Sequence, residues 1–72
     1  MTRDEFLTNF KDILQTDADI NFDTKLSDIE EWDSLAQLST SAFFDSAFGV
    51  RVSLTDFESM NSVNDLAEKV GL

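Results

Sequence analysis

Apolar residues recur at helical spacing in two long stretches of the chain, and a capping residue precedes each of them. Thr2 and Glu5 have the Thr-x-x-Glu spacing of a capping box, which marks the start of a helix. A second helix is expected from just after Asp33 to about Phe48, where Gly49 supplies a C-terminal stop. The stripe behind the first box predicts an amphipathic helix and comprises Phe6, Leu7, Phe10, Ile13 and Leu14.

The second predicted helix carries apolar residues around much of its circumference. Leu35, Leu38 and Ala42 share one side of it. Such a pattern is typical of a helix surrounded by neighbours, so we expect this one to be central in a small bundle. Asp45 and Ser46 should be among its more solvent-exposed positions. Two further apolar sides consist of Phe44 with Phe48 and of Phe43 with Ala47.

A short helical segment is predicted after the second helix. Residues 50–52 alternate like a strand, but three residues without a partner strand are better interpreted as an extended link. Thr55 and Glu58 repeat the capping-box spacing. This spacing predicts a short helix that begins there and runs to about Met60.

Ser62 and Asp65 form a related cap before the last helix, which is expected to end at Gly71. No internal repeat or proline linker divides the chain, so residues 1–72 are expected to form one domain. The predicted fold is all-α, a small bundle of three principal helices plus one short helix, with a long first loop. The stripe of the last helix is Val63, Leu66, Ala67 and Val70.

The segment from Thr16 to Trp32 has no helical periodicity. A structureless connection of this length exceeds the usual limit of about 12–15 residues, so we expect it to be functional or partly helical. Residues 27–30 are expected to form a short helical turn. The isolated apolar residues that should pin the loop onto the helices are Ile20, Phe22, Leu26 and Ile29.

Charge and composition limit the possible functions. Five basic against fifteen acidic residues give a net charge of −10, which repels nucleic acid and anionic membranes and favours proteins with basic patches as partners. The chain has no cysteine and no histidine, which removes thiolate metal sites and the commonest general base, so an enzyme is not expected. No apolar run approaches the roughly 20 residues that span a bilayer, and the first residues do not look like a signal peptide. We therefore expect an acidic monomer of the cytoplasm.

Alternating acids in the first loop give a possible calcium motif. Asp17, Asp19, Asn21 and Asp28 match the ligand spacing of an EF-hand loop. Phe22, however, occupies the position at which that loop needs glycine for its sharp turn. A solvated acidic loop without a specific metal site is therefore the preferred interpretation, and weak divalent-cation binding is compatible with it.

Four acids stand in the six residues directly before Ser34. They could simply stabilise the following helix through its dipole, by about 0.3–1 kcal/mol per charge. They could equally form a docking surface for a basic enzyme, which would raise the association rate more than the affinity. The residues assigned to this docking surface are Asp28, Glu30, Glu31 and Trp32.

Ser34 is expected at the first turn of the second helix with its hydroxyl outward. An Asp-Ser pair before an apolar run is more often than not a helix cap. Helix N-termini also accept phosphate readily, because they carry partial positive charge and free N–H groups. Without a histidine base, this serine cannot act as a hydrolase nucleophile, so any chemistry at its hydroxyl must come from another protein. The sequence therefore indicates a modification site.

The segment Trp32–Leu35 resembles the phosphopantetheine attachment motif of acyl and peptidyl carrier proteins. The resemblance covers essentially the whole chain, including the long first loop, Phe48–Phe57 and Met60–Leu66. Length and acidity also agree with the family. The resemblance implies an acyl-carrier-like bundle in which a phosphopantetheinyl transferase moves 4′-phosphopantetheine from coenzyme A to Ser34, using magnesium.

The resemblance also implies roles for the neighbours of the serine. Asp33 matches the aspartate near the transferase's magnesium site, and Leu35 matches the hydrophobic residue that partners contact beside the arm. The terminal thiol would carry an acyl or aminoacyl group as a thioester between a loading ligase and downstream synthase or transferase enzymes. Many members have acids just after the serine. The corresponding positions of this chain are Ala36, Gln37 and Ser39.

The sequence thus predicts a free-standing, non-enzymatic carrier protein that is modified at Ser34. The alternative is a small acidic helical interaction module in which Ser34 is only a helix cap. A calcium-binding first loop is the third interpretation.

Overall fold

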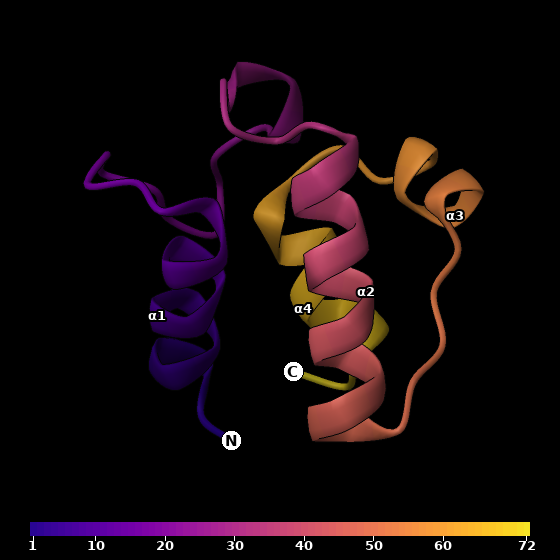
Figure 1. Ribbon diagram of the computed structural model, residues 1–72. Helices are drawn as coiled ribbons and strands as arrows, with labels where there is room; N and C mark the ends of the chain where they lie inside the picture. Colours follow the sequence, from indigo (N-terminus) through magenta and orange to yellow (C-terminus); the bar gives the residue numbers. More distant parts are fainter.

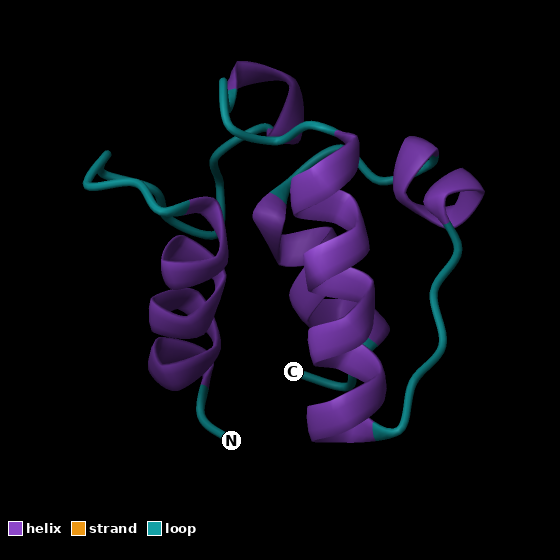
Figure 2. Cartoon of the chain, viewed as in Figure 1, coloured by secondary structure: helices purple, strands orange, loops and turns teal.

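The computed structural model describes residues 1–72 and contains helices, turns and loops but no β-strand (Figure 1 and Figure 2). Its elements are α1 (Arg3–Leu14), a 3₁₀ turn (Leu26–Asp28), α2 (Ser34–Phe48), α3 (Leu54–Glu58) and α4 (Val63–Lys69). In Figure 1, α2 runs between α1 and α3, and α4 is seen behind it. The predicted all-α bundle with a long first loop and one short extra helix is confirmed.

Capping boxes begin α1 and α4 where the sequence predicted them. The hydroxyl of Thr2 accepts a hydrogen bond from the Glu5 N–H at 3.1 Å, and the Glu5 carboxylate accepts one from the Thr2 N–H at 2.9 Å. The latter bond lowers the pKa of Glu5, because it favours the ionised carboxylate. Ser62 and Asp65 form the same reciprocal pair. Gly49 ends α2 in the left-handed conformation, with φ of 67°.

The predicted start of α3 is wrong. Thr55 and Glu58 do not form its capping box; the N-cap is Ser53, and Asp56 completes the box. The Ser53 N–H donates to the Asp56 carboxylate at 2.9 Å, and the Asp56 N–H donates to the Ser53 hydroxyl at 3.2 Å. Both spacings occur in the sequence, so tertiary packing decides between them. The observed start leaves Phe57 in the core and keeps Thr55 and Glu58 exposed.

Phenylalanines of α1 and α2 are the largest fully buried side chains of the core. Phe6, Phe10 and Phe44 are fully buried. Aromatic pairs at ring separations of 4.5–7 Å stabilise a fold beyond the burial of their area. The ring of Phe6 has four such neighbours, with centroids 5.9–6.4 Å away, namely Phe22, Phe43, Phe44 and Phe48. α4 contributes Val63, Leu66 and Ala67 to the same core.

Backbone hydrogen bonds fasten the first loop to the segment that begins α4. The Leu26 N–H donates to the Asn61 carbonyl at 2.9 Å, and the Thr24 carbonyl accepts from the Val63 N–H at 3.0 Å. The 3₁₀ turn begins one residue before the predicted helical turn of residues 27–30 begins and ends two residues before that turn ends. The apolar residues expected to pin the loop are packed on the core: Ile20, Leu26 and Ile29 are buried and Phe22 is partly buried.

One face of α2 is open to solvent, contrary to the expectation that neighbours surround this helix. The exposed fractions of Leu35 and Leu38 are 72% and 56%, and Ala42 is exposed as well. Asp45 and Ser46 are exposed as predicted. The hydrophobic pattern could not reveal the open face, because an apolar side chain is buried only where another element covers it. The buried residues of α2 are Ala36, Thr40 and Phe44.

Arg3 links the two ends of the chain and the first loop. Its guanidinium donates hydrogen bonds to the Leu72 carbonyl and to the Asn64 side-chain oxygen. It also lies 4.2 Å from the centroid of the Phe22 ring, within the range of a cation–π interaction. In Figure 1 both termini lie towards the end of the bundle at which α2 finishes, away from the start of α2.

Candidate functional site

Ser34 is the first residue of α2, and its side chain is exposed. The hydroxyl makes no hydrogen bond within the protein. The N-cap of the helix is Asp33, whose carboxylate accepts a hydrogen bond from the Ala36 N–H at 2.9 Å. The interpretation of Ser34 as the helix cap is therefore wrong, because its neighbour performs that role and leaves the serine hydroxyl free.

The first turn of α2 differs from that of the other helices. α1, α3 and α4 each carry an acidic residue in the first turn that completes a capping box, whereas α2 has Ala36 at that position and no acid in its first turn. The backbone N–H groups of Ser34 and Leu35 have no acceptor within the protein. Free N–H groups at a helix start attract a phosphate. The residues present therefore fit a phosphate-linked group on the Ser34 hydroxyl.

The acidic stretch forms a tight turn that leads into α2. The Trp32 N–H donates to the Ile29 carbonyl at 3.1 Å, and the Asp33 N–H donates to the Glu31 carbonyl at 2.9 Å. Asp28 and Glu30 are exposed, as is Asp33, and Glu31 is partly buried. The structure thus keeps these carboxylates in solvent contact, close in sequence to Ser34.

Trp32 differs from the acids around it, because its side chain is partly buried and packs against the core. The ring centroid lies 5.6 Å from that of Phe10 in α1 and 5.3 Å from that of Phe57 in α3. The expectation that Trp32 also contacts a partner remains a prediction. Its packing role is a feature that the sequence did not reveal.

The possible calcium ligands of the first loop do not converge. No group of three or more acidic side chains lies close enough to hold a metal ion. The side chain of Asn21 accepts a hydrogen bond from the Asp23 N–H at 2.8 Å, and the Asn21 N–H donates to the Thr24 hydroxyl at 3.0 Å. Asn21 therefore stabilises a local turn, and the EF-hand spacing of Asp17 and Asp19 does not produce an EF-hand arrangement.

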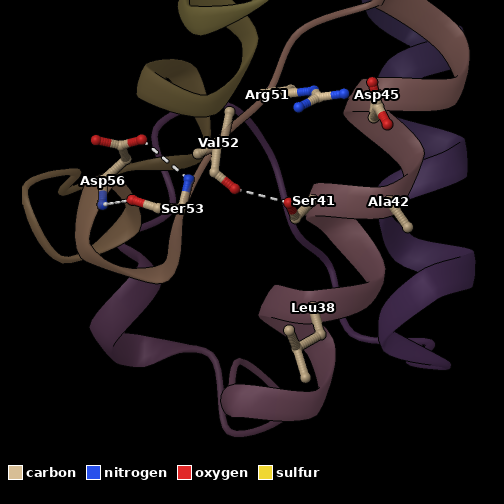
Figure 3. A pocket seen from close by; sticks show the side chains of 8 residues that line it. All are labelled: Leu38, Ser41, Ala42, Asp45, Arg51, Val52, Ser53 and Asp56. Atoms are coloured by element: carbon tan, nitrogen blue, oxygen red, sulfur yellow. Dashed lines mark hydrogen bonds between the residues drawn. The ribbon is translucent and has the colours of Figure 1, made fainter.

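The open face of α2 forms an apolar ridge of Leu35, Leu38 and Ala42 that continues from Ser34. A groove of about 570 Å³ lies beside it, between α2 and the segment that leads into α3. Figure 3 shows this groove, in which the Ser41 hydroxyl donates to the Val52 carbonyl at 2.7 Å. Of these three ridge residues, the sequence predicts partner contact only for Leu35. The helical spacing places the three on one side of α2, but it predicts a buried side and not an exposed one.

A second groove of about 340 Å³ lies on the other side of the ridge. The C-terminal end of α1 forms one wall, with Ile13 and Gln15, and α2 forms the other, with Leu35 and Ser39. Asp33 also borders it. The second groove therefore borders the start of α2, whereas the first lies further along the helix, beside Leu38 and Ala42.

Comparison with family models identifies the class of protein that this fold and helix start define. Residues 4–70 match the family described as "Phosphopantetheine attachment site", so the chain belongs to this family. Its all-helical architecture is consistent with the acyl and peptidyl carrier proteins. Searches of curated proteins and of solved structures gave no match. Members of the family carry a covalently attached 4′-phosphopantetheine group, and carrier domains of this kind are typically non-catalytic.

None of the helices could serve as a membrane span, since each is too short or too polar. The family assignment supports a carrier that interacts with a phosphopantetheinyl transferase and with biosynthetic enzymes in general.

Proposed function

We propose that this protein carries acyl or aminoacyl intermediates as thioesters on a 4′-phosphopantetheine arm attached to Ser34. The observation that supports the proposal best is that two neighbouring residues have different roles at the start of α2. Asp33 caps the helix, while Ser34 exposes a hydroxyl without a hydrogen-bond partner. Within a family defined by phosphopantetheine attachment, a free and exposed serine at a helix start is the residue best suited to accept the group.

Attachment requires the Ser34 oxygen to form a bond to the phosphorus of coenzyme A that bears the pantetheine unit. The bond from that phosphorus to the adenosine bisphosphate portion breaks, and the hydroxyl proton leaves. The chain has no histidine, and no base is hydrogen-bonded to the Ser34 hydroxyl, so the transferase has to supply the base. Once attached, the arm supplies a thiol that holds the cargo as a thioester.

We also propose roles for the two neighbours of Ser34, Asp33 in the attachment reaction and Leu35 in contact with partner enzymes. The Asp33 carboxylate caps α2 with one oxygen, at 2.9 Å from the Ala36 nitrogen, and is exposed. It can therefore contribute negative charge to a magnesium ion held by the transferase. Leu35, 72% exposed, is suited to apolar contact with enzymes that approach the arm.

The residues before α2 form the docking surface that we propose for the transferase: the exposed acids Asp28 and Glu30, and the partly buried Glu31 and Trp32. Charges of this kind mainly raise the rate of association with a basic surface. Replacing Glu30 and Glu31 by glutamine should therefore slow modification while leaving the fold intact. An unchanged rate would mean that the docking surface lies elsewhere.

We also propose that the carrier acts as a monomer in the cytoplasm, between a loading ligase and downstream synthase or transferase enzymes. The net charge of −10 supports the monomer, because copies of the chain repel one another. Light scattering at low and moderate ionic strength measures the oligomeric state directly. A stable dimer under both conditions would contradict this part of the proposal.

Intact-mass spectrometry tests the proposed modification. The protein is incubated with coenzyme A, magnesium and a broad-specificity phosphopantetheinyl transferase. The expected result is one added phosphopantetheine on the wild type and none on Ser34→Ala, with Ser39→Ala as a matched control that is still modified. No addition to the wild type with several transferases would favour an acidic interaction module that binds a partner without carrying a cargo.

A further inference from the structure

Trp32 is the only tryptophan of the chain, and it lies two residues before Ser34. Its ring packs against one aromatic residue from each of two helices. The ring of Phe10 in α1 lies 5.6 Å away at an interplanar angle of 60°, and the ring of Phe57 in α3 lies 5.3 Å away at 87°. The second geometry is an edge-to-face arrangement, which is favourable for aromatic rings.

The two partners of this ring are themselves fixed in the core. Phe10 is 0% exposed and Phe57 is 2% exposed. Phe57 is also the only buried side chain of α3, a helix of five residues. Its ring contacts Phe44 of α2, with centroids 6.2 Å apart. The position of α3 therefore depends on Phe57, and Phe57 packs directly against Trp32.

The backbone between Trp32 and Ser34 is held only by short-range hydrogen bonds. The Trp32 and Asp33 N–H groups donate to carbonyls within three residues, the Asp33 carboxylate accepts from the Ala36 N–H, and the N–H groups of Ser34 and Leu35 are free. The turn and the first turn of α2 are therefore connected to each other through Asp33. The turn is tied to the core by the side chains of Trp32 and Ile29. A change in the position of the indole ring would therefore shift the start of α2.

We propose that Trp32 is a positioning residue for the modification of Ser34, and that Phe57 acts on the same reaction through it. The packing of the indole between Phe10 and Phe57 fixes the turn, and the turn fixes the direction of the Ser34 hydroxyl towards the transferase. The inference rests on the proposed attachment at Ser34. It assigns Trp32 a role distinct from that of the acids beside it, which act on docking.

Steady-state kinetics of the transferase separate these roles. Trp32→Leu and Phe57→Leu should each lower kcat by about two- to tenfold, the coupling that one aromatic pair provides, with KM changed less than twofold. Glu30→Gln and Glu31→Gln should instead raise KM. Trp32→Phe should recover most of kcat. The double variant of Trp32 and Phe57 should be no slower than Trp32→Leu, because both substitutions disrupt one contact.

Phe48→Leu is the matched control for lost stability. Phe48 is an aromatic residue that packs against the same core. Its ring lies next to the rings of Phe6, Phe43 and Phe44 and not next to Trp32. It should destabilise the fold without changing kcat. A Phe57→Leu variant with wild-type kcat, a Phe48→Leu variant that is equally slow, or a Trp32→Leu variant that changes only KM would each overturn the proposal.

Tryptophan fluorescence provides a readout that needs no modification. Phe57→Leu should shift the emission of Trp32 to longer wavelength, since it opens one side of the indole to water, whereas Phe48→Leu should leave the emission unchanged. The absence of a shift in Phe57→Leu would overturn the coupling even if Trp32→Leu failed to fold. Failure of the proposed function has a separate signature, because the wild type would then gain no mass.

Discussion

Asp33 has two separable roles, as helix cap and as a source of charge for the transferase, and two substitutions distinguish them. Its carboxylate accepts the Ala36 N–H at 2.9 Å. Removing such an N-cap costs about 1 kcal/mol, with a range of roughly 0.5–2 kcal/mol. Asp33→Ala should therefore lower the free energy of unfolding by about 1 kcal/mol. In a domain of this size that corresponds to about 4–8 °C in melting temperature.

Asp33→Asn should be less harmful to stability, because asparagine caps helices about as well as aspartate. It loses only the interaction of the charge with the helix dipole, about 0.3–1 kcal/mol at an exposed site. It also removes the charge proposed to face magnesium. We therefore expect Asp33→Asn to be close to the wild type in stability but slow in phosphopantetheine transfer.

Urea unfolding, followed by circular dichroism, and transferase kinetics measure the two effects on the same samples. Asp4→Asn is the control, since Asp4 is exposed in the first turn of α1, the end of that helix that lies away from the start of α2 (Figure 1). If Asp33→Ala is as stable as the wild type, the cap contributes nothing. If Asp33→Asn is modified at the wild-type rate, the carboxylate charge has no part in the reaction.

Three further predictions concern stability. Thr40 is 0% exposed and its hydroxyl has no partner, so Thr40→Val, which keeps the shape, should raise the free energy of unfolding by about 1 kcal/mol; an unchanged or lower value in urea unfolding would contradict this. Moderate salt should raise the urea midpoint, because it screens repulsion within a net charge of −10, and a midpoint that does not respond to salt would refute it. The pKa values of Glu5 and Asp56 are lowered by hydrogen bonds from the N–H groups of Thr2 and Ser53, so both carboxylates stabilise the fold above their ordinary pKa and lose this contribution as the pH falls through the lowered values. Glu5→Gln, which keeps the hydrogen bond but does not titrate, should reduce this acid-induced loss in a series of urea midpoints against pH.

Local sequence signals predicted most of the fold because most of the helix starts are determined locally. Thr2 with Glu5 and Ser62 with Asp65 form their boxes within one turn, and no competing box lies nearby. At α3 two overlapping boxes fit the sequence, and the choice depends on Phe57, whose burial involves residues distant in the chain. Spacing alone cannot resolve such a choice.

The position of the candidate site in the chain could be predicted from the sequence, but the exposure and burial of the side chains around it could not. The motif located Ser34, and the acidic stretch before it is exposed much as expected. The exposure of Leu38 and the burial of the Trp32 ring depend on which elements cover them. No other element of the chain covers Leu35, Leu38 and Ala42, so this apolar side of α2 remains open.

The hydrogen bonds of Arg3 have a practical consequence for how this protein can be handled. Because Arg3 holds the last residue and the start of α1 together, a tether at either terminus leaves from the same region of the bundle. The 15 residues of α2 span about 22 Å, and Ser34 lies at the far end of that length. A carrier immobilised through either terminus would therefore present its serine outward, accessible to soluble enzymes on a sensor surface.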